Sequence, residues 1–279
     1  MASEFKSFYK TVGGNEGNKC HYPTRLDTYG KGCSHNCDYC YARSLLEFRG
    51  LWHPEDPAVA DIVKVRKKVQ SLDKDDVMRL GGMTDCFQPI EKIYRTTYST
   101  IKELNEAGVG YLIVTKSPMV ADKEYLEVMD KDLAHIQITV TTTDGDFYQK
   151  LGFEKAPYPS ERIKAIKKLQ KAGFDVSIRL SPYIDGFIDF DKLKGIDNAV
   201  LEFLRVNHWI KKWFDIDYSE YTLKQGGYFH LPLEKKIELA NKIKQYFKSI
   251  TVCEDEDEAY EWFKENFNPN KEDCCNLRK

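Results

Sequence analysis

The sequence lacks several features that would place it in other protein classes. No window of its 279 residues approaches the roughly 18 apolar residues of a membrane span, and the first residues, MASEFKSFYKTVGG, lack the apolar core of a signal peptide. Neither sign of charge is in large excess, because the chain has 42 basic and 44 acidic residues. The protein therefore has no global positive field that would attract a polyanion. We therefore expect a cytoplasmic protein without a membrane partner, in which nucleic-acid contacts would need a local patch.

Repeats at a solenoid period and low-complexity tracts are also absent. Cysteine, in contrast, is present eight times. Without a secretion signal, this number argues against a disulfide scaffold and for metal binding or redox chemistry in a reducing compartment.

Six short β-rich runs alternate with amphipathic stretches along the chain. The β-rich runs lie at 25–29, 77–81, 110–115, 135–142, 175–180 and 199–206, and the main amphipathic stretches lie at 93–107, 123–131, 160–172 and 233–247. This alternation predicts parallel βαβ units whose right-handed crossovers curl the sheet toward a barrel. The predicted fold is α/β, a partial (β/α)6 TIM-type barrel with a C-terminal extension.

We expect the chain to divide into three parts. Residues 1–24 form an N-terminal extension and residues 25–206 form the barrel. Residues 207–279 hold an aromatic-rich segment (207–230), a helix, a further strand at 249–253 and a Cys-Cys tail. Functional residues of such barrels lie at the C-terminal ends of the strands.

The run GKGCSHNCDYCYAR follows the first predicted strand and contains the spacing C-x3-C-x2-C at Cys33, Cys37 and Cys40. Three thiolates on one loop can bind three irons of a [4Fe–4S] cluster and leave the fourth iron open to S-adenosylmethionine. Gly30 and Gly32 are expected to supply the sharp turns of this loop. Two alternatives remain: a zinc site completed by His35 or a remote cysteine, and structural cysteines without a ligand.

These residues resemble the radical S-adenosylmethionine superfamily, whose C-x3-C-x-aromatic-C loop is matched by Cys33, Cys37, Tyr39 and Cys40. The motifs at 84–91, 115–118 and 179–182 further resemble the spore photoproduct lyase-like branch, over roughly residues 25 to 190. The resemblance implies an enzyme that reductively cleaves S-adenosylmethionine to a 5′-deoxyadenosyl radical, which abstracts a hydrogen atom from a substrate. It also implies an electron donor such as flavodoxin or ferredoxin.

The resemblance assigns cofactor contacts to the strand ends. Gly81 and Gly82 would receive the methionine amino group, and Thr84 and Asp85 would contact the cosubstrate. Lys116 would neutralise the cosubstrate carboxylate. The alternatives are a polar turn that caps the following helix and a solvated lysine.

Further contacts are expected from three residues on later strands. Thr141 is a candidate for the ribose or the amino acid, and Arg179 and Ser181 are candidates for cosubstrate or substrate. Tyr39 is expected near the adenine. The branch implicates both Tyr39 and Tyr41 in hydrogen-atom transfer, although packing around the cluster is the favoured alternative for Tyr41.

The sequence departs from this branch at the hydrogen-donor cysteine, because Gly82 stands where the branch has that residue. Cys86, four residues later, is expected either to donate the hydrogen atom or to be a small buried cysteine. Repair of a thymine photoproduct is therefore not expected as such.

Residues outside these motifs leave alternatives open. Cys20, Cys253, Cys274 and Cys275 could together bind an auxiliary cluster or metal, although adjacent cysteines are awkward ligands for one cluster. The aromatic and lysine residues of 207–230 suit either base stacking or a loop packed over the barrel. Glu202 is either a polar core group or an acid of the site.

The first substrate hypothesis is a nucleobase, nucleotide or nucleic acid. The alternatives are radical modification of a peptide or small metabolite, and a non-catalytic iron–sulfur or zinc-binding protein.

Overall fold

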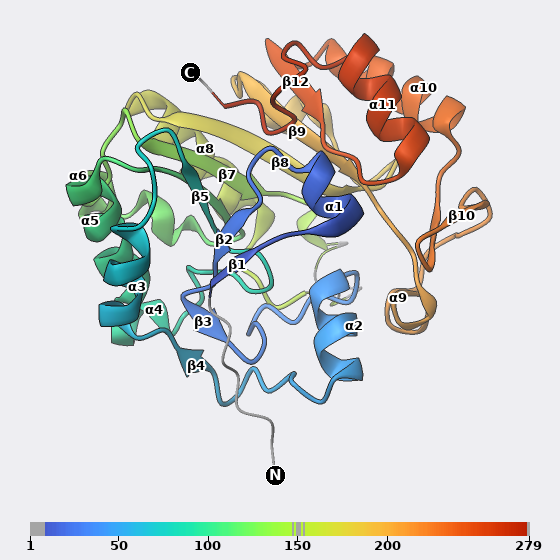
Figure 1. The fold of residues 1–279 in the computed structure, drawn as a ribbon. Helices are drawn as coiled ribbons and strands as arrows, with labels where there is room; N and C mark the ends of the chain where they lie inside the picture. The colour runs from blue at the N-terminus through green and yellow to red at the C-terminus, as the bar shows by residue number, and fades with distance from the viewer. Residues whose placement is uncertain (1–8, 147, 149–151, 153, 278–279) are drawn as a thin grey trace.

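One curved sheet forms the centre of the molecule (Figure 1). The computed structural model describes residues 9–146, 148, 152 and 154–277. Its sheet has the strand order β1-β2-β5-β6-β7-β8-β9-β12. The strands are β1 (Tyr9–Thr11), β2 (Thr24–Leu26), β5 (Val77–Leu80), β6 (Gly110–Thr115), β7 (Ala134–Thr139), β8 (Asp175–Tyr183), β9 (Asn198–Phe203) and β12 (Ser249–Val252). The β1–β2 pair is antiparallel and all other neighbouring pairs are parallel.

Helices connect the parallel strands, as the alternation in the sequence predicts. They are α1 (Gly14–Lys19), α2 (Tyr41–Phe48), α3 (Ile62–Val69), α4 (Glu91–Tyr94), α5 (Thr96–Ala107), α6 (Lys123–Val128), α8 (Pro159–Lys171), α9 (His208–Trp213), α10 (Leu233–Lys244) and α11 (Asp257–Asn266), with 3-10 turns at Pro118–Ala121 and Phe190–Leu193. Two small ribbons pair β3 (Tyr29–Gly30) with β4 (Ala58–Val59) and β10 (Leu223–Gln225) with β11 (Tyr228–His230). Because the large sheet has two edges, the predicted partial barrel is confirmed as an open one.

The two faces of the sheet are covered differently. Successive side chains of a strand point to opposite faces, so Tyr111 and Ile113 of β6 enter the main core with the helices. Leu112, between them, packs on the other face against Tyr22, Cys274 and Cys275. Tyr22 near the start and Cys274 and Cys275 near the end of the described chain therefore pack on the face opposite to Tyr111 and Ile113.

Some boundaries differ from the sequence prediction. The helix expected at 93–107 is broken at Arg95, whose φ of 53° lies in the left-handed region, and α5 begins at the next residue. The strand expected at 249–253 is present as β12 and pairs with β9. Residues on both sides of the predicted barrel segment 25–206 thus contribute strands to one sheet.

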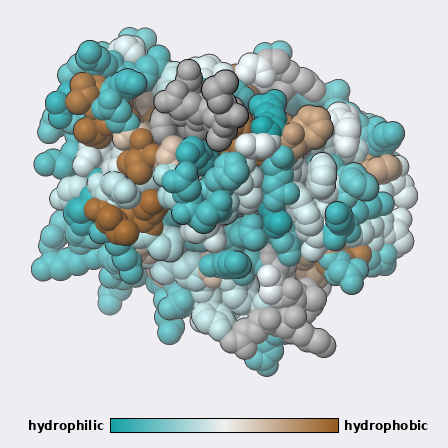
Figure 2. All heavy atoms as spheres, turned by 90° about the horizontal axis from the view of Figure 1, so that it is seen from below, coloured by the Kyte–Doolittle hydropathy of each residue, from teal (hydrophilic) through white to brown (hydrophobic). Residues whose placement is uncertain are grey.

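The face in Figure 2 is mostly hydrophilic, with hydrophobic side chains in small separate groups. No helix in the described part of the chain is both long enough and apolar enough to cross a bilayer.

Candidate functional site

A cavity opens at the C-terminal ends of the parallel strands. Its lining includes Gly81 after β5, Lys116 after β6, Thr139 at the end of β7, and Arg179 and Ser181 of β8. Cys33, Cys37 and Cys40 line the same cavity. The fold therefore brings the predicted cysteine loop and most of the predicted strand-end residues to one place.

The cysteine loop is shaped by left-handed backbone positions. Gly32 has a φ of +114°, and a Cβ there would lie 3.2 Å from the backbone nitrogen of Pro54. Lys31 and Asn36 also have positive φ, at 62° and 44°. Gly30 instead pairs with Ala58 in the β3–β4 ribbon, so the prediction that it supplies a sharp turn is wrong.

Cys33 and Cys37 are buried and Cys40 is half-buried, and burial raises the pKa of each thiol. For Cys37 the neighbouring Glu154 carboxylate raises the pKa further, while Lys116 opposes it. Cys40 is the N-cap of α2, and its Sγ lies 3.4 Å from the backbone nitrogen of Arg43. Since metals bind thiolates, loading this loop requires the release of protons.

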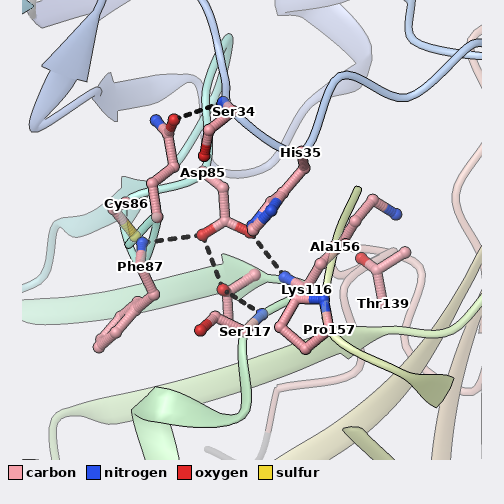
Figure 3. Close-up of polar contacts among 12 residues, drawn as sticks. Ser34, His35, Asp85, Cys86, Phe87, Lys116, Ser117, Thr139, Ala156 and Pro157 are labelled. Carbon is pink, nitrogen blue, oxygen red and sulfur yellow. Dashed lines mark hydrogen bonds and ion pairs between the residues drawn. The ribbon is translucent and has the colours of Figure 1, made fainter. Parts of the chain in front are cut away.

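Asp85 ties the cysteine loop to two strand ends (Figure 3). Its carboxylate accepts hydrogen bonds from the Thr115 hydroxyl and the Lys116 backbone, both at 2.7 Å, and Nε2 of His35 lies 3.2 Å away. Burial alone would raise the pKa of Asp85, but these donors hold it below its ordinary value. With its oxygens occupied in this way, Asp85 positions the loop, and we propose this role in place of the expected cosubstrate contact.

A second carboxylate, which the sequence motifs did not single out, organises the turn after β5. Asp27 accepts backbone hydrogen bonds from Gly82, Met83 and Thr84 at 2.9, 2.9 and 3.0 Å. The Thr84 hydroxyl donates to the Tyr29 carbonyl. No motif marks Asp27, which lies inside the strand predicted at 25–29, whereas β2 ends at Leu26 and leaves Asp27 in the following loop.

The turn that Asp27 holds contains the two predicted glycines, and both line the cavity. Gly81 has a φ of +88°, and a Cβ there would lie 2.9 Å from the Val114 carbonyl oxygen. A Cβ on Gly82 would lie 3.0 Å from Cδ of Arg25. A Cβ at either position would press against the protein itself, so the close packing of this turn on β6 and Arg25 favours glycine at both.

Glu154 is a buried acid beside the cysteine loop, and no sequence motif indicated it. Its buried carboxylate pairs with Arg162 and accepts a hydrogen bond from the Tyr39 hydroxyl. Nζ of Lys116 lies 3.6 Å from the same carboxylate and 5.1 Å from the centre of the Tyr39 ring. Burial opposes ionisation, but Arg162 and Lys116 lower the pKa of Glu154 to about 2.

Arg179 and Ser181 both contact Glu202, which lines the cavity. Arg179 donates to the Glu202 carboxylate at 2.6 Å and to Gln137 at 2.7 Å, and the Ser181 hydroxyl donates to Glu202 at 2.7 Å. Burial would raise the pKa of Glu202, but Arg179 lowers it below the usual range. Glu202 is therefore a polar group of the cavity wall.

The tyrosines beside Cys40 lie in different surroundings. The Tyr41 hydroxyl donates to the Gly82 carbonyl at 2.8 Å, and the Arg205 guanidinium lies 4.6 Å from the centre of its ring. The Tyr39 hydroxyl lies 3.0 Å from the Thr141 hydroxyl. Tyr39 and Tyr41 line the cavity, whereas Thr141 is not among the lining residues and contacts Tyr39 instead. A catalytic role for Tyr41 stays a prediction.

Cys86 lies away from the cavity. Its side chain has no exposed surface and belongs to the main hydrophobic core, and the cavity-lining residues do not include it. Burial also raises the pKa of its thiol. This placement favours the alternative of a small buried cysteine over the hydrogen donor.

The other four cysteines line the cavity from the side of the chain ends. Sγ of Cys274 lies 3.6 Å from Sγ of Cys253, which directly follows β12. The cavity is thus lined by two groups of cysteines, one from the cysteine loop and one from the segments near the chain ends.

The aromatic segment 207–230 contributes no side chain to the cavity lining. Phe214 and Tyr221 are buried, Trp209 and Trp213 contact each other, and Arg43 of α2 lies over the Trp213 ring at 4.1 Å. These contacts favour the packing alternative over base stacking.

The residues fit the two cofactors that the sequence predicts. Three thiols from one loop face a shared cavity, which is the donor set of a cluster with one open iron. The Gly81–Gly82 turn lines the same cavity, as does Lys116, whose ammonium lies 3.6 Å from the Glu154 carboxylate.

Comparison with protein families finds a match to the Radical SAM superfamily model over residues 28–192. Among curated proteins, an uncharacterized protein of Mycobacterium tuberculosis is 25% identical over 193 residues, which are 64% of this chain and 56% of that protein. The Radical SAM Nα-GlyT isomerase of Pseudomonas phage M6 is 23% identical over 198 residues, 69% of this chain and 40% of that one. The chain spans about half the length of the curated relatives it matches.

Two kinds of solved structure share the fold. Spore photoproduct lyase complexed with dinucleoside spore photoproduct matches with a TM-score of 0.61 and 17% identity, covering 84% of this chain and 76% of that chain. Streptococcus suis SuiB bound to the precursor peptide SuiA matches with a TM-score of 0.55 and 12% identity, covering 82% of this chain and 48% of that one. At these identities the likeness concerns the fold alone.

Proposed function

Because the chain belongs to the radical SAM superfamily, we propose that it binds a [4Fe–4S] cluster through Cys33, Cys37 and Cys40 and cleaves S-adenosylmethionine reductively. When bound, these groups supply an organic radical that abstracts a hydrogen atom from a substrate. The observation that carries the proposal is the convergence of the three thiols and the Gly81–Gly82 turn on one cavity. A small electron carrier such as flavodoxin or ferredoxin is the proposed reductant.

The chain's own residues orient the cosubstrate. Gly81 and Gly82 would provide backbone groups for the methionine amino group, and Lys116, which also pairs with Glu154, would offset the charge of its carboxylate. Thr84 and Asp85 act indirectly, because their hydrogen bonds hold the glycine turn and the cysteine loop. Arg179 and Ser181, with Glu202, form a polar wall for the substrate end of the cavity.

The proposed substrate is a nucleobase, nucleotide or nucleic acid. Support comes from the shared fold with a lyase that was solved with a dinucleoside spore photoproduct. Arg79 also lines the cavity and brings a positive charge to it, whereas Arg205, which lines it too, is paired with Asp255. Gly82, at the place of the lyase donor cysteine, supports a different final step.

A peptide is the second candidate, because SuiB shares the fold and was solved with a precursor peptide. Salt dependence separates the two candidates. Binding of a short DNA or RNA oligonucleotide should weaken steeply as salt rises, since phosphate contacts release counterions. No binding at low salt would favour the peptide.

The activity itself is tested by anaerobic reconstitution with iron and sulfide, followed by dithionite and S-adenosylmethionine. We expect 5′-deoxyadenosine from the unsubstituted chain and none from Cys37→Ala. Cys86→Ala is the matched control, because its thiol is buried outside the cavity, and it should keep its iron. Absence of 5′-deoxyadenosine from the fully iron-loaded chain would leave only the non-catalytic metal-binding alternative.

A further inference from the structure

Two arginines on neighbouring strands line one side of the cavity. Arg25 of β2 and Arg79 of β5 are register partners in the parallel sheet, and both contribute to the cavity lining. Neighbouring strands lie about 4.8 Å apart, so the two side chains start close together on one face of the sheet. On the basis of the function proposed above, we propose that Arg79, beside Arg25, binds a phosphate group of a nucleotide substrate.

The charge of Arg79 sets it apart from most other cations of the cavity. Six lysine and arginine side chains line the cavity, and four of them have a carboxylate partner. These pairs are Lys19–Asp257, Lys116–Glu154, Arg179–Glu202 and Arg205–Asp255. In the described part of the chain no carboxylate pairs with Arg79, although this residue is half-buried. A cation that is partly withdrawn from water gains from an opposite charge, so Arg79 is suited to receive an anion.

One hydrogen bond orients the Arg79 side chain and leaves its terminal nitrogens available. Nε of Arg79 donates to the Gly81 carbonyl at 3.2 Å. Among the described residues, neither terminal nitrogen of this guanidinium has an acceptor. A guanidinium held at Nε still offers N–H groups at both terminal nitrogens, and this planar edge matches two oxygens of a phosphate. Arg79 can therefore bind a phosphate with defined geometry as well as with charge.

Arg25 adds a second positive charge beside the glycine turn. Its Nη2 donates to the Cys20 thiol at 3.7 Å, and a Cβ on Gly82 would lie 3.0 Å from its Cδ. Like charges on adjacent strands repel each other, whereas an anion near both is attracted by both. A phosphate bound to Arg79 would thus also be stabilised by Arg25.

The other half of the sheet contributes acids that have cationic partners of their own. Glu202 of β9 and the two acids after β12, Glu254 and Asp255, line the cavity. Each of the three is paired, and the partner of Glu254 is the buried Lys236. Their repulsion of a phosphate is therefore reduced, and the phosphate is expected on the side of Arg79.

Two other anions compete for Arg79, namely the carboxylate of S-adenosylmethionine and a thiolate of Cys253. Lys116 already offers a positive charge for the cosubstrate carboxylate from the next strand. The pKa of the Cys253 thiol is lowered mainly by hydrogen bonds with Cys274 and Cys275, and Arg79 adds to this electrostatically. Both alternatives predict an effect of Arg79 that does not depend on a phosphate of the substrate.

The test uses the full chain, reconstituted with iron and sulfide and saturated with S-adenosylmethionine. Anaerobic calorimetry compares the common nucleoside 5′-monophosphates with the matching nucleosides. We expect at least one monophosphate to bind about ten-fold or more tightly than its nucleoside, because a hydrogen bond to a charged group contributes about that factor. Arg79→Gln should remove this difference. No preference for any monophosphate in the unsubstituted chain, or a preference that Arg79→Gln retains, would overturn the proposal.

Arg66→Gln is the matched control, because Arg66 is exposed, pairs with Glu103 and does not line the cavity. It should keep the preference for the monophosphate, and an equal loss in both variants would contradict a specific role of Arg79. The affinity for S-adenosylmethionine is measured in the same variants. If Arg79→Gln weakens it as much as it weakens monophosphate binding, Arg79 binds the cosubstrate carboxylate and the proposal is wrong.

A measurement on the unsubstituted chain guards against misfolding of the variants. Phenylglyoxal modifies accessible arginines, and mass spectrometry locates the adducts. The preferred monophosphate should protect Arg79 from modification, and its nucleoside should not. Equal modification with both ligands, or equal protection by inorganic phosphate alone, would count against a site for a nucleotide phosphate.

Formation of 5′-deoxyadenosine separates this inference from the proposed function. If the unsubstituted chain forms 5′-deoxyadenosine but shows no preference for a phosphate, only the inference about Arg79 fails. If the iron-loaded chain forms none, the proposed function fails instead.

Discussion

The carboxylate of Glu154 joins four polar groups beside the cysteine loop: Arg162, Tyr39, Lys116 and the thiol of Cys37. Both Glu154 and Arg162 are almost fully buried. A buried ion pair adds little net stability over an apolar pair, but removing one partner leaves the other charge uncompensated. Glu154 therefore fixes the position of Tyr39 and Lys116 more than it stabilises the fold as a whole.

We expect Glu154→Ala to lower the free energy of unfolding by about 3–5 kcal/mol, because Arg162 then becomes a buried unpaired charge. Guanidinium chloride unfolding of the metal-free chain measures this. Lys123→Ala is the control, since the Lys123–Glu127 pair is exposed and its loss should change stability by less than about 0.5 kcal/mol. A loss below about 1 kcal/mol for Glu154→Ala would contradict the argument.

Gly81 offers a second test at the scale of one residue. Gly81→Ala places a Cβ at positive φ and 2.9 Å from a carbonyl oxygen, so we expect it to cost more than about 1 kcal/mol and to weaken S-adenosylmethionine binding. Calorimetric titration of the reconstituted chain measures the binding. Gly145→Ala is the matched control, because a Cβ there meets nothing within 4 Å. Equal affinities for the two variants would remove Gly81 from the proposed cofactor site.

At the scale of elements, Asp85 joins the cysteine loop to the ends of β5 and β6. Its partners come from three chain segments: His35, Phe87, and Thr115 with Lys116. These contacts hold the cysteine loop, with Cys33, Cys37 and Cys40, and the glycine turn at the same cavity. The geometry of the site therefore depends on the loop and both strands together.

We expect Asp85→Asn to speed amide hydrogen exchange at Lys116 and Phe87, because one acceptor oxygen becomes a donor and the backbone bonds weaken. Cluster retention on desalting should fall as well. Asp122→Asn is a suitable control, since Asp122 precedes α6 without a side-chain capping bond. If exchange rises equally in both variants, Asp85 does not position the loop.

At the scale of the whole molecule, residues 19–22 pack against the C-terminal segment on one face of the sheet. Lys19 pairs with Asp257, and Tyr22 packs with Cys274 and Cys275 against Leu112. Asp273 accepts hydrogen bonds from the backbone nitrogens of Cys275 and Leu277, at 2.7 and 2.8 Å. Segments near both ends of the described chain thus cover one face of the open barrel.

Asp273→Ala should lower the free energy of unfolding by about 1–3 kcal/mol, because two backbone donors of the tail lose their acceptor. Thermal unfolding measures this loss. Glu272→Ala, at the exposed neighbouring position, should leave the stability unchanged, and similar losses in both variants would argue against a specific role of Asp273.

The sequence alone determined the architecture and marked the loop that we propose binds the cluster. Hydrophobic periodicity marks strands and helices locally, and the spacing of Cys33, Cys37 and Cys40 within one short loop needs no distant partner to be recognised. The strand ends then follow from the alternation, because parallel strands carry their C-terminal ends to one edge of the sheet.

Only the tertiary structure decided which residues hold other groups of the site in place. Glu154 and Asp27 belong to no motif, and their partners lie far away in sequence. Cys86 is near the predicted site in sequence, but its side chain points into the core. Cys253 and Cys274 are 21 positions apart and meet only because β12 joins the sheet and the tail folds back over it. Contacts of this kind depend on long-range packing, which residue spacing does not encode.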